Sequence, residues 1–181
     1  MNITVETNDI LQKIKTTNPR IVGIDGDDGI GKTSLAKDIE KFGYKRISLD
    51  DFLRKKSGGY FKFVDFETLE RTIKQSSNEQ IVIEGVLMRK ILEKLPLTVS
   101  YFVYMADSVW AYDWLEEYQG KYYNLPLNEI IKNVEGEVSR LNKVLNPDSK
   151  PYRMDGFRRE IYEYSYEYKP WESADIILRK D

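Results

Sequence analysis

The chain has 181 residues, of which 41% are hydrophobic and 32% are charged, and its 28 basic and 30 acidic side chains give a net charge of −2. These values predict one folded domain with a sizeable core, and the balanced charge argues against nucleic acid as a partner. Because the chain has no histidine and no cysteine, catalysis by either side chain and zinc sites built from them are excluded, which leaves carboxylates, lysine, arginine, tyrosine and oxygen-bound metals such as Mg²⁺.

Apolar runs and helical patterns alternate along the chain. Ile10, Leu11 and Ile14 recur at helical spacing, so the N-terminal segment 1–18 is predicted to be helical. Short apolar runs predict buried strands at 20–25, 46–49, 81–84, 97–105 and 174–178. Helical patterns lie at 34–42, at 66–74 behind the capping residue Asp65, at 108–118 behind Asp107, and from Pro126 to the break at Asn146-Pro147.

The segment 161–171 fits two patterns. Its tyrosines alternate with polar residues, as in a strand with one buried face. Its place before the last strand of an alternating chain favours a helix, which we predict.

The order of these elements predicts the fold class and the domain organisation. Strands that alternate with helices form parallel sheets, so we expect an α/β fold with a mostly parallel five-stranded sheet. No linker or repeat interrupts the chain, which predicts a single domain over 1–181 with a helical lid region at about 119–160. No apolar run approaches the ~20 residues that cross a bilayer, and the N-terminus lacks a signal-peptide pattern. We therefore expect a cytoplasmic protein with no membrane partner.

A glycine-rich loop follows the first predicted strand and reads Gly26-Asp27-Asp28-Gly29-Ile30-Gly31-Lys32-Thr33, which matches the pattern G-x-x-x-x-G-K-[S/T]. Glycines allow a tight loop whose amides face phosphate oxygens, and the start of the next helix adds partial positive charge. Lys32 can reach the β- and γ-phosphates, and Thr33 can offer its hydroxyl to Mg²⁺. A nucleoside triphosphate is therefore expected here, bound by the residues of the pattern and by Ser34.

Two carboxylates follow predicted strands whose C-terminal ends border the same crevice as the loop. Asp50, after the second strand, is placed to orient a substrate hydroxyl and accept its proton, although an aspartate pair can also cap a loop or helix. Glu84 ends the third strand, where a carboxylate can help to hold Mg²⁺ or simply face solvent. Asp27 and Asp28 carry charge that repels phosphate, so they should point away from it or contact another group.

In order and spacing, these elements resemble the uridine kinase branch of the P-loop nucleoside kinases, which includes phosphoribulokinase-like enzymes. The stretches that carry the resemblance read VGIDGDDGIGKTSLA, ISLDDF, IVIEGVL and SADIIL. The resemblance implies a three-layer α/β/α P-loop NTPase fold with ATP and Mg²⁺. It further implies Lys32 on the phosphates, Asp50 as the catalytic base, and Thr33, Asp50 and Glu84 around the metal ion.

The acceptor of the phosphoryl group is expected to contact Asp50, Phe52 of the D-D-F element, Tyr60 and Asp65. Asp65 is similar to the family's aspartate that binds ribose hydroxyls, and this role competes with capping the next helix. Aromatic faces stack on bases, so Tyr60 is a candidate for nucleobase binding.

Arginine is the main departure from the family. Such kinases carry several arginines on the helix after the fourth strand and in the adjoining lid, whereas residues 107–123 contain none. The cluster RMDGFRRE can fold over the nucleotide as a replacement lid or form a solvated helix face. The cations available in the C-terminal half include Lys121, Arg140, Arg153, Arg158 and Arg159.

We expect an ATP-dependent phosphotransferase that moves the γ-phosphate to a hydroxyl of a small molecule, above all a nucleoside such as uridine or cytidine. One alternative is a kinase of a sugar, a vitamin precursor or a phosphorylated acceptor, which the basic run 54–56 would suit. Another is a nucleotide-binding regulatory protein with weak or no transfer activity. Trp110, Trp114 and Tyr118 recur every four residues, which predicts core packing or a contact in a homodimer.

Overall fold

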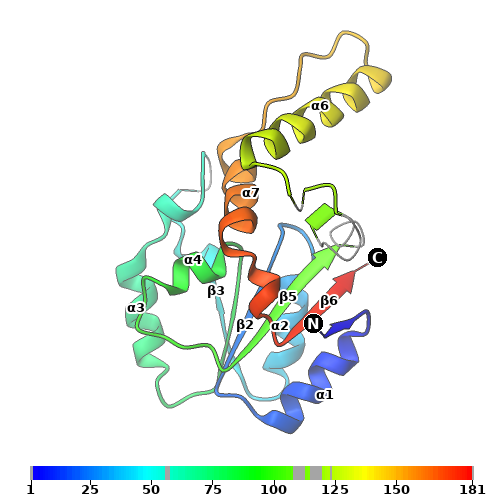
Figure 1. Cartoon of the computed structure of the whole chain (residues 1–181). Coiled ribbons are helices and arrows are strands. Elements are labelled where there is room, and N and C mark those ends of the chain that lie inside the picture. The colour runs from blue at the N-terminus through cyan, green and yellow to red at the C-terminus, as the bar shows by residue number, and fades with distance from the viewer. Residues whose placement is uncertain (1, 56–57, 108–112, 115–119, 123, 181) are drawn as a thin grey trace.

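The computed structural model describes residues 2–55, 58–107, 113–114, 120–122 and 124–180. These residues form a six-stranded, all-parallel sheet in the order β1-β6-β5-β2-β4-β3 (Figure 1). This sheet confirms the predicted α/β class. The strands are β1 (Ile3–Thr4), β2 (Ile21–Gly26), β3 (Lys45–Ser48), β4 (Ile81–Glu84), β5 (Tyr101–Asp107) and β6 (Ile176–Lys180).

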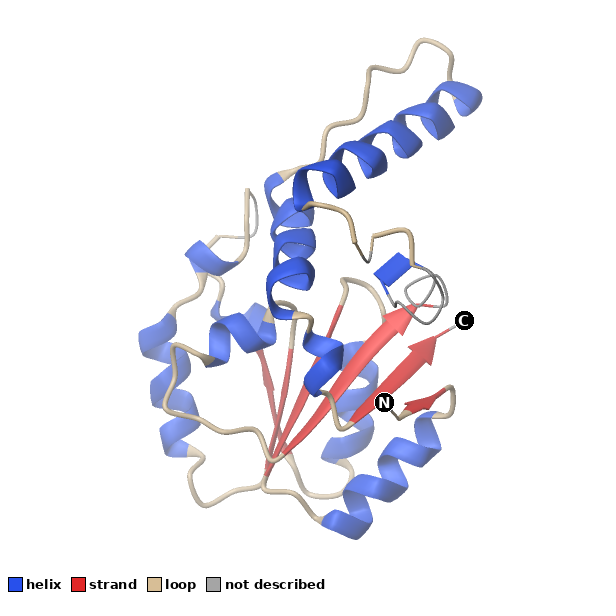
Figure 2. Cartoon of the chain, in the orientation of Figure 1, coloured by secondary structure: helices blue, strands red, loops and turns tan. Residues whose placement is uncertain are grey.

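Helices cover both faces of the sheet, which gives the predicted three layers (Figure 2). The described α-helices are α1 (Thr7–Thr17), α2 (Lys32–Glu40), α3 (Phe66–Gln75), α4 (Met88–Leu92), α6 (Leu127–Leu145) and α7 (Gly156–Tyr168). Short 3₁₀ turns form η1 (Leu49–Phe52), η2 (Phe61–Phe63) and η4 (Pro170–Ser173).

The central strand β2 explains why the sheet has a core on each side. All of its residues are buried. Successive side chains of a strand point to opposite faces. Val22 and Ile24 pack in the cluster that includes the apolar residues of α1 and α2, whereas Ile21 packs in the cluster formed with α3, α4 and α7. The glycine-rich loop therefore starts from a strand that is buried along its whole length.

The prediction of five strands was wrong, because the described residues form six. The additional strand is β1, which pairs with β6 through Ile3 opposite Ile177. Two residues are too few to show an alternating pattern. The N-terminal segment 1–18 is therefore an edge strand followed by the predicted helix, with Ile10 and Ile14 of α1 buried.

Other boundaries shift by a few residues. The last two strands begin later than predicted, at Tyr101 and Ile176. The second helix ends at Glu40, so Phe42 lies beyond it and is 40% exposed instead of packing on its buried face. The helix predicted at 108–118 lies largely outside the described residues.

The C-terminal helices α6 and α7 confirm two predictions: the helix that starts after Pro126, and a helix instead of a strand at the alternating tyrosines. α6 projects from the body of the molecule together with the chain that follows it, and α7 leads back toward the sheet (Figure 1). Ile130 and Ile131 near the start of α6 are buried, whereas Leu141, Val144 and Leu145 near its end are exposed. None of the helices formed by the described residues has the length and apolar character required to cross a membrane.

Candidate functional site

The glycine-rich loop connects β2 to the N-terminus of α2. Gly26, Gly29 and Gly31 have φ angles of 146°, 76° and 95°, a region that residues with side chains rarely adopt. A Cβ atom on Gly26 would also collide with the carbonyl oxygen of Met105 on β5. These glycines therefore permit both the left-handed turns of the loop and its close approach to the neighbouring strand.

Lys32 is the first residue of α2 and is 7% exposed. Its Nζ atom donates a hydrogen bond of 2.5 Å to the carbonyl oxygen of Asp27 in the loop. Burial lowers the pKa of Lys32, and the nearby carboxylates of Asp25 and Asp28 oppose that shift. The ammonium group thus lies inside the loop, where a phosphate oxygen can replace the carbonyl as its partner.

Two adjacent parallel strands, β3 and β4, bring Asp50 and Glu84 to the same edge of the sheet. β3 and β4 pair with Ser48 opposite Glu84, and Asp50 comes two positions later in η1. Thr33 Oγ1 of α2 donates a hydrogen bond of 3.2 Å to Glu84 Oε1, which links the loop to this carboxylate. Arg46 Nη1 lies 3.3 Å from the same oxygen and balances the charge of the buried Glu84.

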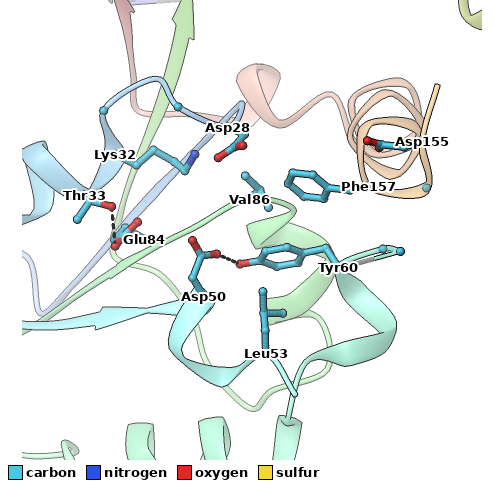
Figure 3. Close-up of a pocket in the computed structure, with 15 residues that line it drawn as sticks. Asp28, Lys32, Thr33, Asp50, Leu53, Tyr60, Glu84, Val86, Asp155 and Phe157 are labelled. Atoms are coloured by element: carbon cyan, nitrogen blue, oxygen red, sulfur yellow. Dashed lines mark hydrogen bonds between the residues drawn. The ribbon is translucent and has the colours of Figure 1, made fainter. Parts of the chain in front are cut away.

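Lys32, Thr33, Asp50 and Glu84 line one cavity of about 670 Å³. Figure 3 shows Lys32 and Asp28 on one side of it and Asp50 on the other, with Thr33 and Glu84 beside them. A cavity of this volume falls in the range of small-molecule sites. The loop and the two strand-end carboxylates therefore converge on one space, as the sequence predicted.

The far wall of the cavity is apolar and aromatic, and is lined by Leu53, Tyr60, Val86 and Phe157 (Figure 3). The rings of Tyr60 and Phe157 stack with their centroids 5.7 Å apart. The Tyr60 hydroxyl donates a hydrogen bond of 2.6 Å to Asp50 Oδ1. Burial and the adjacent Asp50 raise the pKa of Tyr60, so this hydroxyl stays protonated and acts as a donor.

Sequence reasoning missed three residues of this wall. Leu53 and Val86 directly follow the D-D-F and E-G elements, and that proximity could have identified them. Phe157 lies at the start of α7, within the cluster RMDGFRRE that the sequence offered as a replacement lid, and that cluster was the available signal.

Two predicted acceptor contacts do not occur among the described residues that line the cavity. Asp65 accepts a hydrogen bond of 3.2 Å from the backbone N–H of Thr68 and so caps α3, and it also pairs with Arg54 Nη2 at 3.0 Å. The bond from Arg54 holds the pKa of Asp65 below its ordinary value. Phe52 packs against the core beneath η1. The structure thus gives both residues other contacts.

The two aspartates of the loop face different surroundings. Asp28 lines the cavity, whereas Asp27 lies outside it and pairs with Arg158 Nη1 of α7 at 3.1 Å. The expectation that these carboxylates point away from the phosphate site or contact another group is therefore confirmed for Asp27 and not for Asp28, which faces the cavity beside Lys32 (Figure 3). Of the other residues predicted to bind the nucleotide, Gly29, Gly31, Lys32 and Thr33 line the cavity, whereas Gly26, Ile30 and Ser34 are not among its described lining residues.

Most of the other candidate clamp cations have partners away from the cavity. Arg140 is exposed on the projecting part of α6. The remaining ion pairs are Arg153 with Glu135, Arg159 with Glu163, and Lys121 with Asp113 and Glu137. Arg158 is therefore the candidate whose guanidinium group contacts the glycine-rich loop, through Asp27.

A buried pair supports the loop from behind. Asp25, the residue before the loop, is 1% exposed, and the Tyr164 hydroxyl of α7 donates a hydrogen bond to its Oδ2 atom. The backbone N–H of Gly26 donates to Oδ1 at 2.8 Å. Desolvation by burial raises the pKa of Asp25 to about 6, although both hydrogen bonds act in the opposite direction.

Trp114 packs within the chain. Its ring lies 5.3 Å from that of Tyr122, 6.0 Å from that of Tyr162 and 5.6 Å from that of Trp171, measured between centroids. This cluster supports the core-packing interpretation for Trp114. Trp110 and Tyr118 lie outside the described residues, and the contact in a homodimer stays a prediction.

The fold is a six-stranded parallel sheet flanked by helices, like that of P-loop kinases, and the glycine-rich G-x-x-x-x-G-K-[S/T] motif follows its central strand β2. Among solved structures, the chain is similar to a possible uridine kinase from Bacillus stearothermophilus, with a TM-score of 0.52 at 15% identity over 94% of this chain and 97% of that one. An uncharacterized protein from Eubacterium ventriosum gives a TM-score of 0.36 at 15% identity over 88% and 87% of the two chains. The sequence matches no protein-family model and no curated protein.

Proposed function

We propose that this protein is an ATP-dependent phosphotransferase that moves the γ-phosphate to a hydroxyl of a small, nucleoside-like molecule. One observation carries the proposal: a single cavity is lined by the phosphate loop on one side and by Asp50 on the other. A phosphate held at Lys32 would then face a carboxylate that can orient an attacking hydroxyl.

The reaction follows from this placement. The acceptor oxygen forms a bond to the γ-phosphorus while the bond from that phosphorus to the β–γ bridging oxygen breaks, ADP leaves, and the hydroxyl proton passes to Asp50. Lys32 and the loop amides bind the phosphates through this step. Arg158, which pairs with Asp27 of the loop, would exchange that partner for a phosphate oxygen as charge develops there.

The donor set of the cavity fits Mg²⁺. Thr33, Asp50 and Glu84 present one hydroxyl and two carboxylates, the hard oxygen ligands that this ion prefers. Among the described residues no cluster of three acidic side chains forms a closed metal cage, and Mg²⁺ at nucleotide sites is held largely by water and substrate phosphates. When bound, the ion neutralises charge on the phosphates.

The charges around the cavity favour a neutral acceptor over a phosphorylated one. Among the described residues that line the cavity, Lys32 is the single basic side chain. Arg54 pairs with Asp65, and Lys55 lies 5.5 Å from the centre of the Phe63 ring. The rings of Tyr60 and Phe157 instead offer an apolar wall for a flat base.

The test is transfer of labelled γ-phosphate from ATP with Mg²⁺ to a panel of nucleosides, nucleotides, sugars and vitamin precursors. We expect a labelled product with a nucleoside, and a fall in transfer of about 10²-fold or more in Asp50→Asn with nucleotide binding retained. A labelled product with phosphorylated acceptors alone would replace the nucleoside assignment by that class. Equal rates for Asp50→Asn and the unmodified protein would remove Asp50 from the mechanism.

A second candidate function is nucleotide-dependent regulation without efficient transfer. It is favoured by the pairing of Arg158 with an aspartate of the loop, and by the lack of any arginine among the described residues that line the cavity. Tight ATP binding with no product from any acceptor would support this function over the first.

A further inference from the structure

The start of α7 lies directly against the segment 58–61, which carries Tyr60 into the cavity. A Cβ atom on Gly156 would lie 3.4 Å from the carbonyl oxygen of Gly58. Gly59 has a φ of +135°, and a Cβ atom there would lie 3.0 Å from Glu160 Oε1. Glycines thus let the segment and the helix approach each other closely enough for side chains of α7 to reach the backbone of the segment.

Glu160 of α7 makes that contact. Its Oε2 atom accepts hydrogen bonds from the backbone N–H of Tyr60 at 2.6 Å and of Phe61 at 3.2 Å. A carboxylate that accepts two backbone N–H groups forms charge-assisted bonds, which are stronger and more directional than neutral ones. Glu160 therefore determines where the backbone of Tyr60 lies.

Tyr60 in turn holds the carboxylate of Asp50. Its ring is 4% exposed and is stacked on Phe157, with an angle of 24° between the ring planes. Its hydroxyl donates to Asp50 Oδ1 at 2.6 Å. With one carboxylate oxygen held in this way, Oδ2 is left to accept the hydrogen of an acceptor hydroxyl.

We propose that Glu160 is a positioning residue that acts through Tyr60 on Asp50, so that α7 orients the carboxylate that receives the acceptor's proton. This inference rests on the proposed phosphotransferase function and deepens it. The chain of contacts joins residues 100 positions apart in the sequence.

The test compares three variants of the full chain in the transfer assay. Glu160→Ala should lower kcat by about 10- to 100-fold, because a displacement of reacting groups by about 1 Å costs up to that factor. ATP affinity, measured by calorimetry, should stay unchanged because the phosphate loop is untouched. Glu160→Gln should recover most of the activity, because its amide oxygen can still accept both N–H groups. The matched control is Glu163→Ala on the same helix, which removes only the pair with Arg159 and should keep the kcat of the unmodified protein.

A double-mutant cycle separates positioning from a general loss of structure. Tyr60→Phe keeps the stacked ring and removes the hydroxyl that holds Asp50. If Glu160 acts through that hydroxyl, Glu160→Ala should add less than twofold to the effect of Tyr60→Phe. Multiplying effects, or an equal loss in Glu160→Gln and Glu160→Ala, would overturn the inference.

Phosphate transfer by the unmodified protein distinguishes a failure of the positioning inference from a failure of the proposed function. If it transfers phosphate and Glu160→Ala keeps its full kcat, the positioning inference fails and the proposed function stands. If it transfers phosphate to no acceptor, the proposed function fails, and the positioning inference falls with it. Amide hydrogen exchange at Tyr60 and Phe61 gives a readout besides activity: protection should fall in Glu160→Ala and persist in Glu160→Gln.

Discussion

The buried carboxyl group of Asp25 makes the free energy of unfolding depend on pH. It lies at the end of the central strand, and Tyr164 and the amide of Gly26 donate hydrogen bonds to it. Desolvation outweighs these donors, so the pKa rises from 3.8 to about 6. The charged form is therefore penalised in the folded protein and not in the unfolded chain.

We predict that Asp25→Asn flattens the dependence of stability on pH between about pH 4 and about pH 6. In that window the folded protein binds more protons at Asp25 than the unfolded chain does, so the contribution of this group to the free energy of unfolding is full below about pH 4 and is lost as the pH rises through about 6. The loss amounts to about 3 kcal/mol at ~1.4 kcal/mol per pH unit.

Urea unfolding at several pH values measures this slope. Asp38→Asn, which removes an exposed carboxylate paired with Lys41, is the control and should keep the wild-type slope. An unchanged slope in Asp25→Asn would assign the dependence to another group.

At the scale of elements, α7 connects the two sides of the candidate site. Arg158 reaches the phosphate loop, Glu160 holds the segment that carries Tyr60, and Tyr164 supports the strand behind the loop. These residues are spaced along the first three turns of one helix. Through these contacts, a shift of α7 would move both the glycine-rich loop and the segment that carries Tyr60.

Arg158→Ala should reduce phosphate transfer by about 10²- to 10³-fold, the cost of losing one donor that stabilises developing charge once Arg158 has exchanged Asp27 for a phosphate oxygen. The comparison is Arg153→Ala, because Arg153 pairs with Glu135 and its side chain is 79% exposed. That control should stay within about twofold, as expected for an exposed ion pair. Similar rates for Arg158→Ala and Arg153→Ala would assign the phosphate clamp to another group.

At the scale of the whole molecule, sheet order places the candidate site. β2 lies between β5 and β4, and the loop after it meets the carboxyl ends of β4 and β3. Parallel strands bring those ends to one edge of the sheet, where ligands bind in open α/β folds. A nucleotide bound at this edge would therefore contact elements from both helical layers.

Binding of ATP with Mg²⁺ should stabilise the folded chain by ~2.7 kcal/mol at 100 times Kd, which corresponds to a rise in Tm of roughly 5–10 °C. Lys32→Ala should abolish most of this rise, because it removes the ammonium group inside the loop. Lys37→Ala, on the exposed face of the same helix, should retain it. Scanning calorimetry with and without nucleotide decides between these outcomes, and an equal rise in Lys32→Ala would exclude the loop as the nucleotide site.

Much of the fold could be predicted from local patterns. The apolar run before the loop, the cap at Asp65 and the period of α6 all act over a few residues, and each appears in the structure. The two-residue strand β1 could not be predicted, because its pairing with β6 involves residues at the other end of the chain. Asp65 shows the same division: its capping role is local, and its ion pair with Arg54 depends on the turn between them.

Local sequence patterns predict the strand, the glycine loop and the helix around Lys32, and the two carboxylates at strand ends, because backbone propensity and side-chain period act over a few residues. The contacts of Phe157 and Glu160 with Tyr60, and of Arg158 with Asp27, come from tertiary packing. Those contacts join segments about 100 to 130 residues apart. Their existence depends on how helices pack on the sheet, which no short stretch of sequence specifies.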